Sequence, residues 1–145
     1  FMDADGSHAP EMLVQLLART TEYDVVIGSR YVEGGHTENP FILRLMSRIV
    51  NGCYSVVLGL PVRDVSNSLK VYRGCLLRGL KLRCSNFDII EEILVKLVRK
   101  HPGMKMVEVP VNFRKRIFGE TKRNLVLFML SYVVTLAKLR FMPLE

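Results

Sequence analysis

A short, uninterrupted apolar run constrains the fold of this chain more than any other feature. Residues 24–28 read Asp-Val-Val-Ile-Gly, so the run ends at a glycine. Apolar residues without polar alternation are typical of a strand buried on both faces. The residues before it predict an amphipathic helix with Leu13, Leu16 and Leu17 on its apolar face, and residues 1–7 read as a strand end running into a turn. Strand, helix and buried strand together predict a parallel sheet in an α/β fold.

The rest of the chain alternates between helical and extended patterns. Apolar residues recur at helical spacing from residue 42 until Gly59, which predicts the longest helix. Leu69–Tyr72 reads as a short strand, and residues 89–98 read as a second amphipathic helix. Met106–Phe113 alternates with period two, but its proline cannot donate to a ladder, which favours an edge strand or a bulge. A basic loop follows, and no linker or repeat is visible before residue 123.

Residues 124–145 form a separate, mostly apolar segment that predicts a C-terminal helix. Asn124, Ser131, Thr135 and Lys138 fall on one narrow polar stripe of that helix. Its uncharged part would be about 21 Å long, which is shorter than the roughly 30 Å hydrocarbon core of a bilayer. Two interpretations stay open at this point: a core helix, or a helix lying at a membrane interface or continuing into a longer span.

The composition narrows the class of partner. Of the 145 residues, 49% are apolar and 24% are charged, which excludes a disordered or low-complexity chain. The 21 basic residues outnumber the 14 acidic ones, and a net charge of +7 favours phosphates, anionic lipid or nucleic acid. Nucleic acid is the weakest of these, because the basic residues are not interleaved with aromatic residues. The three cysteines form no C-x-x-C pair, so neither a disulfide framework nor a zinc site is indicated and a reducing compartment fits best.

The sequence Asp3-Ala4-Asp5 places two carboxylates at a predicted strand end. A turn at this point can bring both toward one hard cation, which in turn holds a diphosphate. By itself the motif is equally compatible with a turn whose aspartates cap the following helix.

Basic residues supply the context for that motif. Arg30 follows the predicted strand 24–28, and residues 116–122 place more cations after a later strand. Ligand sites of parallel α/β sheets lie at the carboxyl ends of the strands. An acidic metal site that faces several cations is the arrangement that a nucleoside diphosphate leaving group requires.

Taken in order, these motifs resemble the C-terminal half of the family 2 glycosyltransferases, most closely the dolichol-phosphate mannosyltransferases and related polyprenyl-phosphate sugar transferases. The resemblance covers nearly the whole chain. It rests on Met2–Ser7 with Pro10-Glu11, Asp24–Tyr31 with Gly34-Gly35, Ser47-Arg48 with Asn51, Asp64-Val65-Ser66 with Tyr72-Arg73, and Glu108–Val111 with Phe113, Arg116, Gly119 and Thr121-Lys122.

The resemblance implies a GT-A-like, Rossmann-like fold with a mixed, mostly parallel sheet flanked by helices. Residues 1–123 would be the C-terminal part of that domain, without the N-terminal half that grips the nucleotide, and 124–145 an appended helix at a membrane surface. The implied reaction is an inverting transfer of a sugar from a GDP- or UDP-sugar to a polyprenyl phosphate, at the cytoplasmic face of a membrane. A partner membrane subunit or an oligomer would be compatible with it. The fragment alone is expected to be inactive.

The same resemblance assigns roles to individual residues. Asp3, Asp5 and Ser7 would hold Mg or Mn on the donor diphosphate, and Asp5 and Arg116 would be the catalytic residues. The phosphates of donor and acceptor would meet a set of basic and hydroxyl side chains, namely Arg30, Arg44, Ser47, Arg48, Arg116 and Lys122. Asp64 would contact the sugar or the acceptor.

One departure from the family pattern leaves alternatives open. Where the family has Asp-x-Thr-x-Gly-Phe, this chain has Asp-Val-Ser-Asn-Ser-Leu over residues 64–69, without the glycine and the aromatic residue. The acceptor and the sugar are therefore not fixed by the motifs. A transferase acting on another glycan or lipid, and a catalytically inactive scaffold of the same fold, remain as alternatives.

Overall fold

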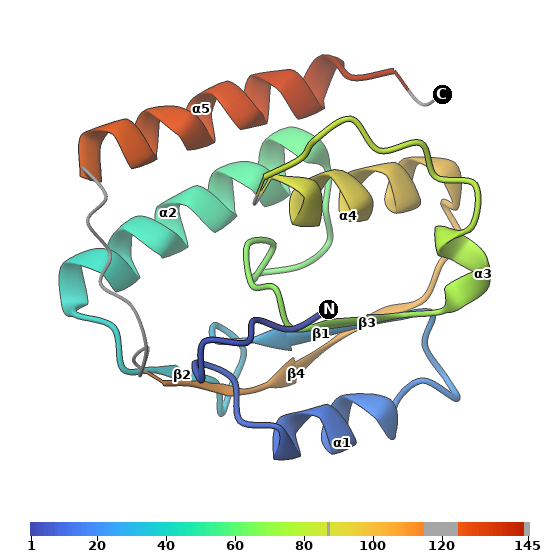
Figure 1. Ribbon diagram of the computed structural model, residues 1–145, viewed down its shortest axis with the longest axis horizontal. Helices are drawn as coiled ribbons and strands as arrows, with labels where there is room; N and C mark the ends of the chain where they lie inside the picture. Colours follow the sequence, from blue (N-terminus) through green and yellow to red (C-terminus); the bar gives the residue numbers. More distant parts are fainter. Residues whose placement is uncertain (87, 115–124, 144–145) are drawn as a thin grey trace.

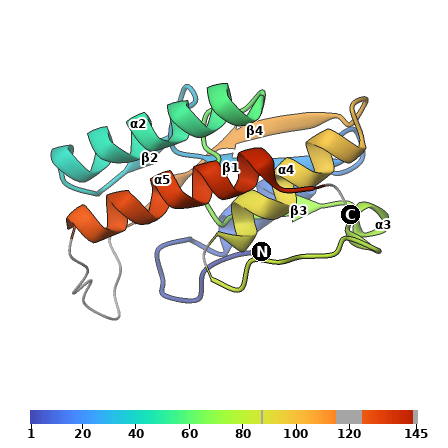
Figure 2. The ribbon, with the colours of Figure 1, turned by 90° about the horizontal axis from the view of Figure 1, so that it is seen from above.

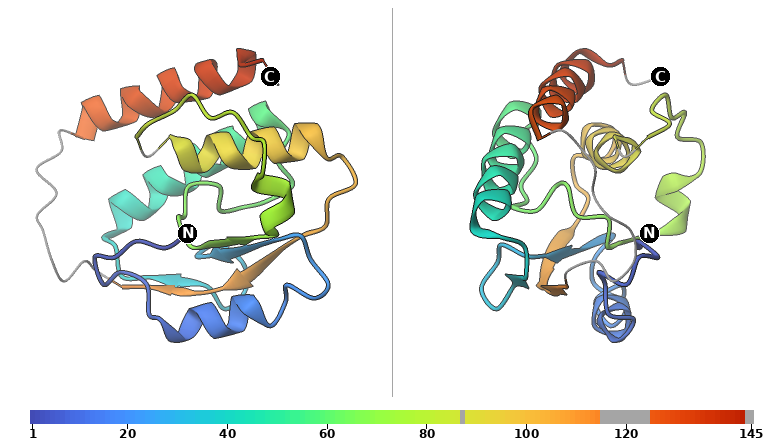
Figure 3. Two further views of the ribbon diagram at one scale, coloured as in Figure 1. Left: turned by 45° about the vertical axis from the view of Figure 1, so that its right-hand side comes forward. Right: turned by 60° about the vertical axis from the view of Figure 1, so that its left-hand side comes forward.

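The computed structural model describes residues 1–86, 88–114 and 125–143. Its elements form layers around a small central sheet (Figure 1). Helix α1 (Glu11–Leu17) lies on one face of the sheet, α2 (Phe41–Leu58) and α4 (Ile89–Lys100) lie on the other, and α5 (Leu125–Phe141) is outermost. Both views in Figure 3 keep α1 and α5 on opposite sides of the sheet. The chain is thus a mixed α/β structure.

The central sheet has the strand order β3-β1-β4. Strand β1 (Val25–Ser29) runs parallel to β4 (Met106–Pro110) and antiparallel to β3 (Lys70–Tyr72). The predicted parallel neighbour is therefore confirmed for β4, while β3 makes the sheet mixed. A second small sheet pairs β2 (His36–Thr37) in parallel with β5 (Asn112–Phe113).

The single strand predicted over residues 106–113 is divided at its proline. Strand β4 ends at Pro110 and lies at the edge of the central sheet, as the missing N–H requires. Val111 donates its N–H to Ser29 O at 3.0 Å, and β5 then continues into the second sheet. The expected edge position is confirmed, and the break passes the chain from one sheet to the other.

The strand end predicted for residues 1–7 is wrong as an element, because the structure has bends there instead. Phe1 makes a sheet-like contact at one end of this segment: its ammonium donates to Lys70 O at 2.8 Å and its carbonyl accepts from Lys70 N at 3.1 Å. Gly6, at φ +79°, then turns the chain away. This segment therefore contacts β3, the antiparallel strand, at Phe1, and its other end meets β5 through the antiparallel bridge between His8 and Phe113.

Strand β1 is buried along its whole length, as its apolar run predicts. Val25 and Ile27 point into the main core, with Tyr54 of α2, Leu94 of α4 and Leu139 of α5. Val26 points to the opposite face, where it packs with Leu16 of α1 and with Leu69 and Val111. Alternate side chains of one strand thus hold both helical layers onto the sheet.

Helix α1 buries less of its predicted face than the sequence indicates. Leu16 is fully buried, Leu13 is half-buried and Leu17 is exposed. A helix of seven residues that crosses one face of a narrow sheet offers a single line of contact, so only the central leucine reaches the core.

Helices α2 and α5 lie side by side (Figure 2). The rings of Tyr54 and Tyr132 meet edge to face with centroids 6.1 Å apart, and the Tyr54 hydroxyl donates to Tyr132 O at 3.3 Å. Within the described residues, α2 is the one helix long and apolar enough to cross a bilayer, by length and composition alone. The short α3 (Gly74–Leu77) connects β3 to the segment before α4.

Candidate active site

Three stretches of chain meet at the carboxyl ends of the parallel strands β1 and β4. Strand β1 ends at Ser29 and leads directly into Arg30 and Tyr31, while its register partner Pro110 ends β4. The loop after Tyr31 returns closely over this edge, because a side chain at Gly35 would place its Cβ 2.6 Å from Ser29 O. Arg30 is therefore where the sequence predicts a ligand-binding cation: at the carboxyl edge of a parallel pair.

Arg30 is held by Asp64 in a buried ion pair. Both carboxylate oxygens accept from the guanidinium, Nε to Oδ2 at 2.8 Å and Nη2 to Oδ1 at 2.7 Å, and Oδ2 also accepts from the Arg30 backbone N–H at 2.8 Å. The side chains are 9% and 0% exposed. Burial works against the charge, but the hydrogen bonds and the charge of Asp64 raise the pKa of Arg30. The pair fixes the guanidinium plane, and within the described chain Nη1 has no hydrogen-bond partner.

This geometry gives Asp64 an observed partner inside the protein. Its carboxylate has no exposed surface, and both of its oxygens are occupied by Arg30. Its predicted contact with a sugar or an acceptor stays a prediction. What the structure places at this point is a carboxylate that orients an arginine and compensates its charge.

Glu108 of β4 holds the turn that carries Asp64. Its two carboxylate oxygens accept from the backbone N–H groups of Arg63 at 2.8 Å and Asp64 at 2.9 Å. The sequence places Glu108 in a motif but assigns it no chemistry. Its position in the middle of a short edge strand gives no local sign that it reaches a turn about 45 residues earlier in the chain.

One of the predicted acceptor-phosphate residues of α2, Arg48, lies over the ring of Tyr31. The Cζ atoms of Arg30 and Arg48 lie 5.1 Å and 5.3 Å from the centroid of the Tyr31 ring. Arg44 lies over the Phe41 ring at 5.7 Å, and Ser47 is half-buried on the same helix. Two of the predicted cations, Arg30 and Arg48, are thus brought to one aromatic ring although they are 18 positions apart.

A groove opens beside Arg48, between α2 and the segment that follows it. It has a volume of about 370 Å³ and is lined by Tyr31, Arg48, Gly52, Ser55, Val56, Val62 and Arg63. Its lining combines two guanidinium groups with apolar side chains and contains no carboxylate. Such a lining suits an amphiphile with an anionic group.

The loop that carries the two aspartates is an internally bonded turn. Asp5 Oδ1 accepts from Ser7 N at 3.0 Å and from Ser7 Oγ at 2.5 Å. Asp3 and Asp5 are half-buried, whereas Ser7 is fully buried. The described residues contain no cluster of three histidine, cysteine or carboxylate side chains that could hold a metal ion. The donor chemistry nevertheless fits Mg or Mn, because carboxylate and hydroxyl oxygens are hard ligands and such ions keep several water ligands.

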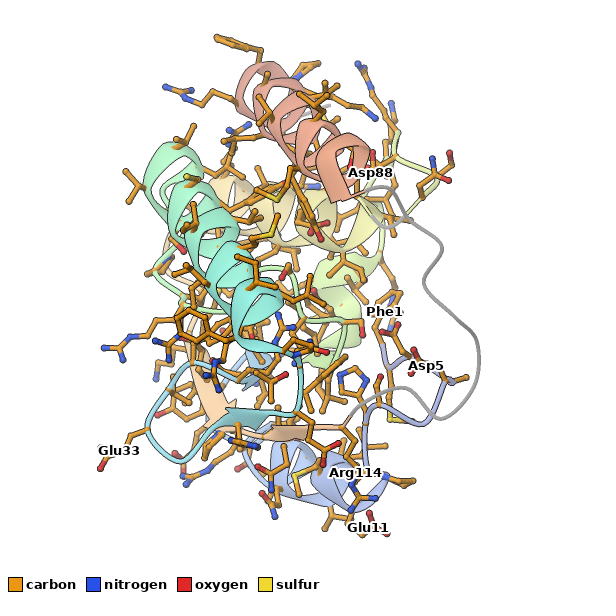
Figure 4. All side chains as sticks on the ribbon, turned by 90° about the vertical axis from the view of Figure 1, so that its left-hand side faces the viewer. Phe1, Asp5, Glu11, Glu33, Asp88 and Arg114 are labelled. Atoms are coloured by element: carbon orange, nitrogen blue, oxygen red, sulfur yellow. The ribbon has the colours of Figure 1, made fainter. Side chains whose placement is uncertain are left out.

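Contacts through His8 and Phe113 join this turn to the Arg30 site. His8 lies 2.9 Å from Asn67 Oδ1 through Nε2, and its ring meets Phe113 edge to face with centroids 5.2 Å apart. Phe113 in turn lies 5.3 Å from Arg30 Cζ. Arg114 donates its N–H to Ser7 O at 2.9 Å, and Figure 4 looks at this end, with Asp5 on the N-terminal loop. The acidic turn and the arginine site therefore share one edge of the molecule.

Arg116 and Lys122, predicted as catalytic and phosphate-binding cations, lie outside the described residues. Their roles stay predictions. Arg114, the last described residue before them, is bonded to the acidic turn.

Sequence reasoning missed a pair of buried charges behind the site. Lys70 is fully buried and donates through Nζ to the carbonyls of Val65, at 2.8 Å, and Asn67. Burial lowers its pKa to about 8, against the opposing charge of Glu91. Burial also raises the pKa of Glu91 to about 7, and Glu91 Oε2 has no hydrogen-bond partner among the described residues. Through these hydrogen bonds, Lys70 ties strand β3 to the 64–68 loop.

The chain is similar to curated mannosyltransferases of lipid phosphates. No family model matches the chain. It is 36% identical over 127 residues to an undecaprenyl-phosphate mannosyltransferase of Micrococcus luteus and 35% identical over 132 residues to a polyprenol monophosphomannose synthase of Mycolicibacterium smegmatis. It is 38% identical over 125 residues to a dolichol-phosphate mannosyltransferase of Pyrococcus furiosus.

These alignments cover most of this chain but only part of each relative. They include 85%, 85% and 83% of the chain, and 51%, 48% and 34% of the respective relatives. The chain therefore spans about half the length of the first two curated relatives. Over that length, its identity to three proteins named as lipid-phosphate mannosyltransferases agrees with the motifs that carry Asp3, Asp5, Arg30 and Glu108. Over most of its own length the chain is thus similar to mannosyltransferases of polyprenyl and dolichol phosphates, in agreement with the resemblance of its motifs to the family 2 glycosyltransferases.

Proposed function

We propose that the protein containing this chain is an inverting glycosyltransferase that moves a sugar from a nucleoside-diphosphate sugar to a polyprenyl phosphate. The observation that carries the proposal is the 35–38% identity, over most of the chain, to relatives named as polyprenyl- and dolichol-phosphate mannosyltransferases. The clustering of acidic turn and arginines at one sheet edge supports it. The sugar of choice is mannose, by the names of those relatives, and the nucleotide is GDP or UDP.

The reaction is a single displacement. A phosphate oxygen of the lipid forms a new bond to the anomeric carbon while the bond from that carbon to the diphosphate oxygen breaks, and the nucleoside diphosphate leaves with the electron pair. The acceptor phosphate is already anionic near neutral pH, so no strong general base is needed. Catalysis then depends on stabilising the charge that develops on the leaving group.

Asp3, Asp5 and Ser7 would hold Mg or Mn at the acidic turn. The metal would neutralise the diphosphate as its bond to the sugar breaks. Two hydrogen bonds from Ser7 to Asp5 Oδ1 hold the Asp5 carboxylate in place within the turn, which supports this assignment. Arg116 and Lys122 would add positive charge to the leaving group.

The acceptor phosphate would lie between Arg30 and the first turns of α2. The charge of Arg30 is compensated by Asp64, so Arg30 would contribute directed N–H groups through Nη1, while Arg44 and Arg48 contribute net charge. Ser47 would donate from the same helix. The apolar part of the groove beside Arg48 leads away from that point along α2.

The outer faces of α2 and α5 would lie on the membrane that holds the lipid, at its cytoplasmic face. On α2 the exposed stripe includes Ile42, Ile49 and Val56, which are 55%, 54% and 83% exposed. On α5 it includes Val133 and Phe141. Apolar stripes beside arginine side chains are typical of helices that lie in a lipid interface.

The experiment that tests this function uses the full-length protein in vesicles with Mn, polyprenyl phosphate and a panel of labelled sugar nucleotides. Wild type is compared with Asp5→Asn, and Asp24→Asn is the matched control, because Asp24 lies at the opposite, amino end of β1 in an ion pair with Arg73. Label entering the lipid with wild type and Asp24→Asn, and not with Asp5→Asn, is the expected result. Replacing Mn with a chelator is expected to abolish transfer.

Other outcomes select the alternatives. Donor binding that depends on Asp5 without transfer to the lipid would keep the transferase and reject polyprenyl phosphate as acceptor. A folded protein that neither binds a donor nor transfers a sugar would reject the enzymatic function and favour an inactive scaffold.

A further inference from the structure

Asn51 of α2 makes more hydrogen bonds than any other side chain on that helix, and none of them is needed to form the helix. Its side chain is buried, with 1% exposed. Nδ2 donates to Ser47 O at 2.8 Å, and it lies 3.1 Å from Ser66 Oγ and 3.3 Å from Ser47 Oγ. Oδ1 accepts from the backbone N–H of Ser66 at 2.8 Å. The amide of Asn51 therefore links helix α2 to the 64–68 loop.

Ser66 joins that amide to the arginine. Its hydroxyl oxygen accepts from Asn51 Nδ2 at 3.1 Å and from Arg30 Nη2 at 3.1 Å. The same guanidinium is fixed by Asp64, whose backbone N–H is in turn held by Glu108. A continuous series of hydrogen bonds therefore runs from α2, through the loop, to Arg30 and on to β4.

We propose that Asn51 is a positioning residue that sets the place of α2 relative to Arg30, so that the acceptor phosphate can be bound by both. The inference rests on the proposed function, because it assigns the phosphate to Arg30 on one side and to Ser47 and Arg48 on the other. Those groups lie on separate elements, and the Ser66 hydroxyl links Arg30 to Asn51, which lies on the same helix as Ser47 and Arg48. A shift of α2 along or away from the loop separates the two halves of the phosphate site.

The chemistry of the site selects an asparagine. The position needs an N–H donor toward a hydroxyl and a carbonyl, and an acceptor toward a backbone N–H, on one short side chain. Aspartate has no donor and would bury a charge, and alanine leaves the Ser66 N–H without its acceptor. Neither replacement restores both edges of the contact.

The experiment is a double-mutant cycle on the full-length protein, with kcat/KM for polyprenyl phosphate in vesicles and KM for the sugar nucleotide as separate readouts. Asn51→Ala is measured in the wild-type and in the Arg30→Lys background, since lysine keeps the charge but loses the fixed fork of donors. Ser66→Ala is the second variant, on a half-buried side chain. Tyr54→Phe is the matched control, because the Tyr54 hydroxyl also ties α2 to another element, through Tyr132 O at 3.3 Å, without touching Ser66 or Arg30 and without lining the groove.

If Asn51 acts through Arg30, Asn51→Ala lowers kcat/KM for the lipid by about tenfold in the wild-type background and by no more than about twofold beside Arg30→Lys, with the donor KM unchanged. Ser66→Ala follows the same pattern, and Tyr54→Phe has the same effect in both backgrounds. Equal effects of Asn51→Ala in both backgrounds would overturn the inference, as would an equal rise in the donor KM.

If the wild type transfers no sugar, the proposed function fails and the same cycle is read from binding of a short-chain polyprenyl phosphate by calorimetry. Binding with coupled Asn51 and Arg30 effects then supports the inference without the reaction. Absence of binding, or additive effects, overturns it.

Discussion

At the scale of single residues, the carboxylates of the site are hydrogen-bonded to other groups of the protein. Asp64 and Glu108 are both occupied by internal donors, and Asp5 is bonded to Ser7. Preorganised groups of this kind keep cations and dipoles in place without reorganisation during the reaction.

Asp64→Asn is expected to destabilise the protein by about 3 kcal/mol, because it leaves the buried Arg30 guanidinium without its compensating charge. The measurement is urea unfolding followed by circular dichroism. Arg73→Gln is the control, since it breaks the surface pair with Asp24 and is expected to cost about 0–1 kcal/mol. Equal losses of unfolding free energy in the two variants would contradict the large contribution expected from the buried Arg30–Asp64 pair.

Glu91 is expected to make stability fall as pH rises. Burial raises the pKa of its carboxyl from 4.5 to about 7, so between these values the folded state binds more protons than the unfolded state, and the free energy of unfolding decreases with pH. Glu91→Gln should flatten this dependence between pH 4.5 and 7.

The neighbouring Glu92 gives the comparison of opposite sign. Burial alone would raise its pKa, but Lys96 and the backbone N–H groups of Cys84 and Arg83 lower it. The stability that Glu92 contributes is therefore complete above pH 4.5 and lost as pH falls through the lowered pKa. Urea unfolding at several pH values measures this dependence in the wild type and in Glu91→Gln. A Glu91→Gln protein whose free energy of unfolding keeps the wild-type slope between pH 4.5 and 7 would contradict the raised pKa of Glu91.

At the scale of elements, helix α2 has two faces with different tasks. Its inner face carries Tyr54 and Asn51, which are buried against α5 and the 64–68 loop, and its outer face carries an exposed apolar stripe. The spacing of apolar residues predicts that α2 is a helix, but it does not separate the buried apolar residues from the exposed ones. Which stripe is buried is decided by the sheet, α4 and α5.

Two substitutions on α2 separate these faces. Ile49→Ser, on the outer stripe, is expected to weaken binding to vesicles of phosphatidylcholine and phosphatidylglycerol while changing stability by no more than about 0.5 kcal/mol. Tyr54→Ala, on the inner face, is expected to cost about 3–5 kcal/mol. Vesicle flotation and urea unfolding check the two expectations, and full vesicle binding by Ile49→Ser would exclude the outer face as the contact surface.

At the scale of the whole molecule, a net charge of +7 accompanies the apolar outer stripes. Charge attracts the protein to anionic lipid over a distance that salt shortens, from about 10 Å at 0.1 M to about 3 Å at 1 M, whereas apolar contact is insensitive to this screening. The two contributions can therefore be separated in one titration.

Binding to vesicles that contain phosphatidylglycerol is expected to fall as NaCl rises from about 0.05 M to about 0.5 M, and to level off above zero. The fall reports the basic residues and the remainder reports the stripes on α2 and α5. Flotation of the full-length protein measures both. Complete loss of binding at high salt would show that the apolar stripes do not enter the lipid.

Local periodicity, a proline without an N–H and an ordered set of motifs were enough to predict the buried strand β1, the helices α2, α4 and α5, the edge position of Pro110 and the resemblance to family 2 glycosyltransferases. The sequence also placed Arg30 at a strand end. The folded chain was needed to show that Asp64 binds Arg30, that Glu108 and Asn51 hold the 64–68 loop, and that Lys70 and Glu91 are buried. The bonded partners are distant in the sequence, from 15 positions for Asn51 and Ser66 to 44 for Asp64 and Glu108, and a polar side chain carries no local sign of which distant group it will meet. The same reason explains the mixed sheet, since the direction of β3 is set by long-range pairing and not by its own residues.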